Sequence, residues 1–327
     1  MGRWLIKGLI VVVLLAVLAG GGSTLWVYTQ FTRPGPHEID ATLIIKPGSG
    51  LKSIARQLQA GGVVKNAIAF ELGARLSGEV NDLHAGEFVF KAGISARETL
   101  AVLKVGKTVL RRFTIVEGFT TAQIIEQIST IEGLSGEVYF ANPSEGALLP
   151  ETYFFSYGED RQDVVERMRL GMTDVLNDLW DVRAENLPFK TPQEALILAS
   201  IVEKETGQPE ERARVAAVFI NRLRLKMRLQ SDPTVSYGIT EGEYVLDRPL
   251  SRADLKQETP YNTYVISGLP PGPIACPGRD ALQAVLHPVQ SDELYFVADG
   301  TGGHAFSKTL AEHNRNVKKW RKLQSAN

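Results

Sequence analysis

Residues 191–206 read TPQEALILASIVEKET, and this stretch is the most informative part of the chain. It opens with a complete helix-start signal: Thr191 is a good N-cap, Pro192 suits the first helical position, and Glu194 completes a capping box. From position 195 to 202 only one residue is polar. A helix of this composition is expected to be enclosed on most sides.

The same stretch ends in two carboxylates, Glu203 and Glu205, that flank Lys204. Burial disfavours the ionised form of a carboxyl group and raises its pKa, and enzymes keep an acid protonated near neutral pH in this way. The two glutamates lie roughly 200° apart around a helix, so they cannot serve one site equally. A solvated last turn before the break at Gly207 is the alternative interpretation.

Composition narrows the class of protein. The 327 residues suffice for two domains, and 44% of them are hydrophobic, as in a well-cored globular chain. The formal net charge of −1 gives no reason to expect nucleic acid as a partner. The single cysteine, Cys276, excludes an intrachain disulfide and a cysteine-based zinc site, and the histidines lack paired metal-ligand spacing. We therefore expect no metal and no cofactor.

The N-terminal part predicts a membrane anchor. No charged residue occurs from Gly8 to Tyr28, a length that can span a bilayer, and Arg3 and Lys7 precede it. The positive-inside rule then predicts a cytoplasmic tail (1–7), a single transmembrane helix (8–28) and a linker (29–41), with the rest of the chain outside the cytoplasmic (inner) membrane, in the periplasm or extracytoplasmic space. A cleaved signal peptide is the alternative, although the apolar residues 25–27 favour a retained anchor.

The remainder predicts an α+β fold. A short strand, a glycine turn and a helix follow one another at 43–58, 88–103 and 113–128, and a further helix is expected over 67–76. We interpret 42–110 as a small α+β module and 111–327 as a larger mixed α+β domain with the 191–206 helix buried at its centre. In that domain we also expect helices at 163–180, from Pro209 and at 310–323, a strand near 294–297, and a hairpin turn at 300–304.

Polar and aromatic residues gather in stretches expected to be loops. Residues 230–237 read QSDPTVSY, where Asp232-Pro233 is interpreted as a helix breaker, and residues 261–264 read YNTY. Aromatic rings can cover the apolar face of a sugar, while amide and hydroxyl groups bond its hydroxyls. Turn chemistry without a ligand is the alternative for each stretch.

Two resemblances extend this interpretation. Residues 43–58 and the elements after them are similar to a LysM module, a fold that binds glycans containing N-acetylglucosamine; a packing module without a ligand is the alternative. Over the whole chain, five motifs in order resemble the YceG-like family of endolytic murein transglycosylases: IVEKET (201–206), QSDPT (230–234), YNTY (261–264), GLPPGPI (268–274) and GHAF (303–306). One departure is visible, because a small polar residue is expected where Cys276 stands.

The second resemblance implies a lyase that cuts the β-1,4 bond between N-acetylmuramic acid and N-acetylglucosamine without water and leaves 1,6-anhydro ends. It implies peptidoglycan strands as substrate, peptidoglycan synthases as neighbours, and the glutamate matching Glu203 as general acid and base. Because Glu205 lies roughly 200° away around the helix, we assign it a structural or supporting role. Further candidate contacts to substrate share carboxylate, amide, hydroxyl or phenol groups: Glu145, Glu151, Tyr153, Gln230, Ser231, Asp232, Thr234, Tyr237, Tyr261, Asn262 and Tyr264.

Two other functions remain open. A lysozyme-type muramidase would hydrolyse the same bond and would use Asp232 as a second carboxylate. A non-catalytic, membrane-anchored protein would instead bind peptidoglycan through the LysM-like module.

Overall fold

The computed structural model describes residues 2–138 and 143–324, so the first residue of the predicted tail and residues 139–142 and 325–327 of the predicted 111–327 domain lie outside it. The chain forms two compact units. One contains the chain up to Arg111 together with 133–135 and 154–159, and the other contains 112–132, 136–153 and the chain from Asp160 onwards.

The first unit contains a strand–helix–helix–strand arrangement followed by a helix. Strand β1 pairs antiparallel with β2, with Ala41 opposite Phe90. Phe70, Phe88 and Leu58 lie fully buried between this sheet and the helices. The elements and their bounds are α1 (Gly2–Thr32), β1 (Ala41–Ile45), α2 (Leu51–Ala60), α3 (Ala67–Ser77), the 3₁₀ turn η1 (Val80–Asp82), β2 (Gly86–Phe90) and α4 (Ala96–Val105).

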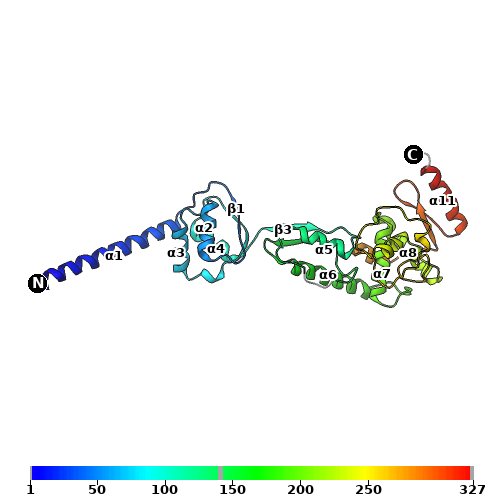
Figure 1. The fold of residues 1–327 in the computed structure, drawn as a ribbon, viewed down its shortest axis with the longest axis horizontal. Coiled ribbons are helices and arrows are strands. Elements are labelled where there is room, and N and C mark those ends of the chain that lie inside the picture. The colour runs from blue at the N-terminus through cyan, green and yellow to red at the C-terminus, as the bar shows by residue number, and fades with distance from the viewer. Residues whose placement is uncertain (1, 139–142, 325–327) are drawn as a thin grey trace. The chain divides into compact units, whose positions relative to one another are not determined.

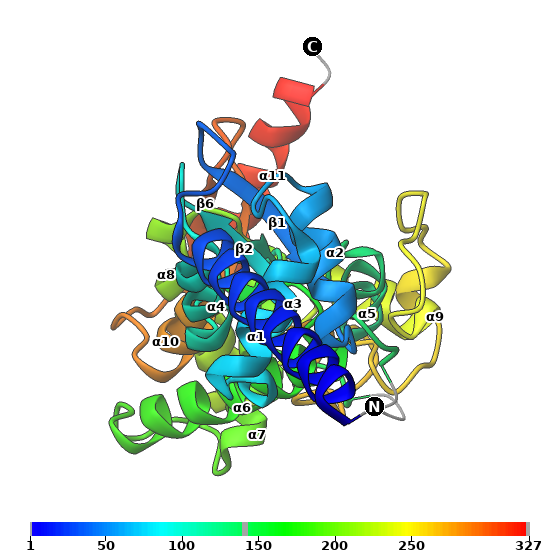
Figure 2. The same cartoon turned by 90° about the vertical axis from the view of Figure 1, so that its left-hand side faces the viewer.

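Helix α1 is the long apolar helix expected from the sequence. Its segment Ile6–Thr32 is long and apolar enough to cross a membrane, and a signal sequence would have the same character. Figure 1 shows its last turns reaching α3, and Figure 2 shows α1 viewed from its N-terminal end. The ring of Phe31 packs 6.5 Å from that of Phe70 and fills the space left by Gly73, where a Cβ would lie 2.4 Å from it. The helix therefore continues through 29–32, where a linker was expected.

The second unit is built around three helices that pack on one another, α7, α8 and α10. Every residue of α7 from Ala195 to Val202 is buried, which confirms the expected central helix. The predicted capping box is present: the Thr191 hydroxyl accepts from the Glu194 N–H, and the Glu194 carboxylate accepts from the Thr191 N–H, both at 3.2 Å. Each fully buried aliphatic side chain of this kind stabilises the fold by about 1.5–3 kcal/mol.

The remaining elements come before, between or after these three helices in the chain. β3 pairs with β4, and β5 pairs antiparallel with β6, so the predicted turn at 300–304 closes a hairpin. The bounds are β3 (Leu110–Thr114), α5 (Thr121–Thr130), β4 (Thr152–Ser156), α6 (Arg161–Asp181), α7 (Pro192–Glu205), α8 (Pro209–Arg224), α9 (Asp232–Thr240), the 3₁₀ turn η2 (Asp254–Lys256), α10 (Arg279–Leu286), β5 (Tyr295–Ala298), β6 (His304–Ser307) and α11 (Leu310–Gln324).

One prediction about residues 230–237 was wrong, and one helix further along was not predicted. Residues 232–240 form helix α9, because Pro233 stands in its first turn, where a missing N–H costs nothing. The helix that was not predicted, α10, begins at Arg279 with Gly278 as its N-cap. In both cases a proline or glycine stands at the start of a helix.

Candidate active site

The two glutamates at the end of α7 face different surroundings. Glu205 lines a cavity of about 450 Å³ together with three of the predicted substrate contacts, Gln230, Asp232 and Tyr264. Glu203 lines neither this cavity nor the larger one beside it. The chain therefore separates the two carboxylates as the helical period requires.

Glu205 has the electrostatics of a general acid. Its pKa is raised to about 7: burial and the negative charge of Asp232 raise it, while the hydrogen bond from Ser231 and the charges of His304 and Arg222 lower it. The Ser231 hydroxyl donates to Glu205 Oε1 at 2.5 Å. A carboxyl group with this pKa is protonated in a large fraction of molecules at neutral pH, so it can give a proton to a leaving group.

A second carboxylate stands in the same cavity. The Tyr264 hydroxyl donates to Asp232 Oδ1 at 2.6 Å, which fixes both side chains at the rim. Gln230 adopts a left-handed backbone conformation with φ of 52°, and its N–H donates to the Thr263 carbonyl at 3.2 Å. The cavity thus presents an acid, a carboxylate, an amide and a phenol to a ligand.

Glu203 is held by structural partners. The backbone N–H of Gly278, the N-cap of α10, donates to Glu203 Oε2 at 2.8 Å, and Arg212 Nη2 lies 3.6 Å from Oε1. Burial raises the pKa of Glu203, and the charge of Glu117 adds to the rise, while Gly278 and Arg212 oppose it. The side chain is 5% exposed. These contacts join α7 to α8 and α10.

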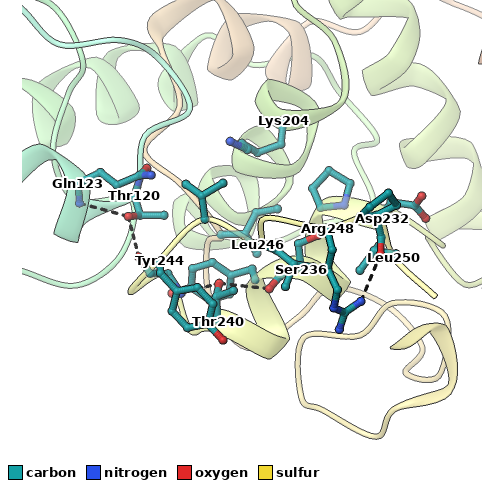
Figure 3. A pocket seen from close by; sticks show the side chains of 16 residues that line it. Thr120, Gln123, Lys204, Asp232, Ser236, Thr240, Tyr244, Leu246, Arg248 and Leu250 are labelled. Carbon is teal, nitrogen blue, oxygen red and sulfur yellow. Dashed lines mark hydrogen bonds between the residues drawn. The ribbon is translucent and has the colours of Figure 1, made fainter. Parts of the chain in front are cut away.

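A larger cavity of about 610 Å³ adjoins the first, since Asp232 lines both. Figure 3 shows Lys204 above this cavity, with Tyr244 and Arg248 on the opposite side. The other lining residues come mainly from α9 and the segment after it: Thr120, Gln123, Pro233, Ser236, Tyr237, Thr240, Gly242, Val245, Leu246, Pro249, Leu250 and Ile274.

A half-buried acid, Glu145, contacts Tyr237 in the lining of the larger cavity. Its carboxylate accepts from the Thr121 N–H at 2.8 Å and from the Tyr237 hydroxyl at 3.3 Å, and burial raises its pKa. The ring of Tyr237 lies 4.7 Å from that of Tyr261. The thiol of Cys276 is fully buried, 3.4 Å from the Thr121 hydroxyl, and burial raises its pKa to about 12. A thiol with this pKa is not a nucleophile at neutral pH.

Residues 43–319 match the model of the YceG-like family, which is most of the chain. The chain belongs to this family. A protein of Bacillus subtilis called endolytic murein transglycosylase is 30% identical over 306 residues, which cover 84% of this chain and 83% of that protein.

Two further comparisons agree with YceG-like membership. Proteins with the same name from Streptococcus pneumoniae are 30% identical over 359 aligned positions; the match covers 93% of this chain but 63% of theirs, so the chain spans less than two thirds of their length. The 2.6 Å crystal structure of a yceG-like protein from Listeria monocytogenes has 30% sequence identity and a TM-score of 0.51, and the match covers 85% of this chain and 99% of that one.

Several of the predicted substrate contacts of this YceG-like chain line neither cavity. Thr234 is fully buried and bonds Thr263 at 2.8 Å, and Asn262, also fully buried, donates to the Gln257 carbonyl at 2.7 Å. Tyr153 donates to the Leu149 carbonyl at 2.8 Å, and Glu151 is exposed; neither residue lines either cavity.

Other lining residues of the Glu205 cavity were not predicted from the YceG-like sequence. Arg222 is 8% exposed and donates to the carbonyls of Leu229 and Leu294 at 2.6 and 2.7 Å. Tyr295 and His313 stack with ring centres 5.2 Å apart. Arg222 lies in α8, Tyr295 in β5 and His313 in α11, and no site signal in the sequence pointed to any of the three. Among residues 2–138 and 143–324, no cluster of three or more His, Cys, Asp or Glu side chains could hold a metal ion.

Proposed function

We propose that this chain is an endolytic murein transglycosylase that cuts the MurNAc-β-1,4-GlcNAc bond inside peptidoglycan strands and leaves 1,6-anhydroMurNAc ends. The observation that carries the proposal is Glu205, a half-buried carboxyl group with a pKa of about 7 in a cavity lined by amide, phenol and carboxylate groups. Family membership and relatives called endolytic murein transglycosylase support it.

In the proposed reaction one carboxyl group acts twice. Protonated Glu205 first gives its proton to the oxygen O4 of the leaving N-acetylglucosamine as the bond from C1 of the muramic acid to that oxygen breaks. The carboxylate then takes the proton of the muramic acid 6-hydroxyl as its oxygen bonds C1. The enzyme returns to its starting state, and no water is consumed.

The choice of Glu205 departs from the sequence-based choice of Glu203. Glu205 faces a cavity and accepts a hydroxyl hydrogen bond from Ser231, whereas the carboxylate of Glu203 accepts the Gly278 N–H and lies beside Arg212. An acid must reach the substrate, and an open cavity gives that access. The role of Glu203 stays a prediction that paired variants test.

We further propose that α1 anchors the enzyme in the cytoplasmic membrane with the second unit outside, where nascent strands and their synthases meet. The apolar segment Ile6–Thr32 supports this location, with the basic Lys7 near its start. The LysM-like module, with its strand–helix–helix–strand order, would hold a glycan strand near the membrane.

A hydrolase is the second candidate, and Asp232 is the observation that favours it. Its carboxylate lines the same cavity as Glu205, and paired carboxylates are the usual equipment of glycosidases. Digestion of purified sacculi in water enriched in ¹⁸O separates the two functions. A transglycosylase releases anhydro ends without the label, whereas a hydrolase adds one labelled oxygen to each new reducing end. If the sacculi bind the protein but release no fragments, neither enzymatic proposal holds.

A further inference from the structure

The larger cavity beside the Glu205 cavity plays no part in the acid–base chemistry described above. We propose that it binds the anionic peptide stem that peptidoglycan carries on muramic acid, and that the enzyme thereby prefers strands that bear stems. This inference rests on the proposed function, since it concerns the substrate of the same site.

The location of the cavity fits this ligand. Asp232 lines both cavities, and Lys204 of the larger one precedes Glu205 directly in α7. The stem is attached through the lactyl group to O3 of the same sugar ring whose C1 would react at Glu205. A stem on the reacting sugar must therefore leave the reaction centre through a neighbouring space of the protein.

The charge of the cavity fits an anion. Lys204 Nζ donates to the Gly118 carbonyl at 3.1 Å, and none of the lysine ion pairs within residues 2–138 and 143–324 involves Lys204. Arg248, the other cation of the lining, is neutralised by two hydrogen bonds to Asp254 at 2.6 and 3.1 Å. Figure 3 shows the Asp232 carboxylate directed away from Lys204. One ammonium group is thus left for a carboxylate of the ligand.

The rest of the lining suits a short peptide. Val245, Leu246 and Leu250 supply an apolar wall on the segment that follows α9, and the hydroxyls of Ser236 and Thr240 supply hydrogen-bonding groups. Small aliphatic side chains and backbone amides, which a stem peptide presents, match these two kinds of surface. The volume of about 610 Å³ is within the usual range for a ligand of several residues.

The test compares two substrates with the full-length chain in detergent. Glycan strands with intact stems and the same strands after removal of the stems by an amidase are digested by the wild type and by Lys204→Gln. The loss of kcat/KM in the variant is expected to be about tenfold larger on stem-bearing strands than on stem-free strands, with the difference in KM. Lys204→Arg keeps the charge and should recover most of the difference. Lys190→Gln, an exposed lysine that lines neither cavity, should behave as the wild type.

An equal loss of kcat/KM on both substrates would identify the cavity as a sugar subsite and overturn the inference. No loss of kcat/KM on either substrate would also overturn it. Binding of soluble glycan fragments to Glu205→Gln, with and without stems, separates this inference from the proposed function. If the wild type cuts neither substrate but the fragments with stems bind at least tenfold more tightly through Lys204, the stem site stands and the proposed reaction fails. If the strands are cut but stems make no difference to binding, the proposed reaction stands and the stem site is overturned.

Discussion

The two sides of the last turn of α7 carry the same residue type in opposite circumstances. On the side of α8 and α10, Glu203 accepts a backbone hydrogen bond from Gly278 and faces the guanidinium of Arg212. On the cavity side, Glu205 accepts a hydroxyl hydrogen bond from Ser231, and the negative charge of Asp232 raises its pKa while the charges of His304 and Arg222 lower it. Burial alone therefore does not make an acid catalytic. Both carboxyl groups have a raised pKa, and access and partners distinguish them.

Substitution of Glu205 should have the largest effect on activity. Glu205→Gln keeps the shape of the side chain and removes its proton transfer, so we expect the release of fragments from sacculi to fall by about 10³-fold or more. The hydroxyl of Ser231 can still donate to the amide oxygen, so the fold should persist. Rates of release and circular dichroism measure the two properties.

Glu203→Gln is the matched control on the other side of the helix. Its amide oxygen can still accept from Gly278, so we expect activity within about fivefold of the wild type and a lower stability, because Arg212 loses a charged partner. An inactive Glu203→Gln beside an active Glu205→Gln would reverse the assignment and restore the sequence-based choice.

The next effect is the dependence of stability on pH. The pKa of Glu205 is about 7 in the folded chain against an ordinary value of 4.5, so the folded state binds this proton more tightly. The resulting stability is fully present below about pH 4.5 and is lost as pH rises through about 7. Such a shift corresponds to about 3 kcal/mol at most. Urea unfolding from pH 4.5 to 8 should therefore show a steeper loss of stability for the wild type than for Glu205→Gln; equal slopes would contradict the raised pKa.

Removal of the cation beside Glu203 should lower the stability of the fold by a smaller amount. Arg212 is 8% exposed and faces Glu117 and Glu203 at 3.6 Å and Asp280 at 3.3 Å. Arg212→Met leaves the buried Glu203 without its cation, and we expect the free energy of unfolding to fall by about 2 kcal/mol, less than for a buried pair in close contact. Arg214→Met on the same helix is the matched control. Its pair with Glu293 is 47% exposed on the arginine side, so a loss below about 1 kcal/mol is expected. Thermal unfolding of both variants tests this, and equal losses would deny Glu203 its structural role.

Much of the fold was predictable because it follows from local signals. The capping box at Thr191, the all-apolar run to Val202 and the glycine turns after the short strands all act within a few residues. Helices α9 and α10 were not predicted, because Pro233 and Gly278 are compatible with both a loop and a helix start. Packing of α10 against α7 and α8 decides between the two, and sequence alone does not contain that contact.

The site was predictable only in part, for a physical reason. Gln230, Asp232 and Tyr264 were identified by residue type, and the structure brings them to one cavity. The period of a helix separates Glu203 from Glu205, but it does not say which of them faces solvent-accessible space. That depends on where α10 begins, because the Gly278 N–H that occupies Glu203 comes from its N-cap.

The smallest effect is expected from substitution of Ser231, the hydroxyl donor to Glu205. The Ser231 hydroxyl is the side-chain hydrogen bond that lowers the pKa of Glu205, and Ser231 is 1% exposed, so no bulk water replaces it. Ser231→Ala removes a donor to the ionised form and therefore raises the pKa of Glu205 further. Because the first step needs the protonated acid, the fall of kcat/KM at high pH should move upward by about 0.5–1 pH unit, with a two- to fivefold change in rate at neutral pH. A downward movement would mean that the hydroxyl accepts a hydrogen bond from the protonated acid, and an unmoved profile would mean that the limiting proton belongs to a different group.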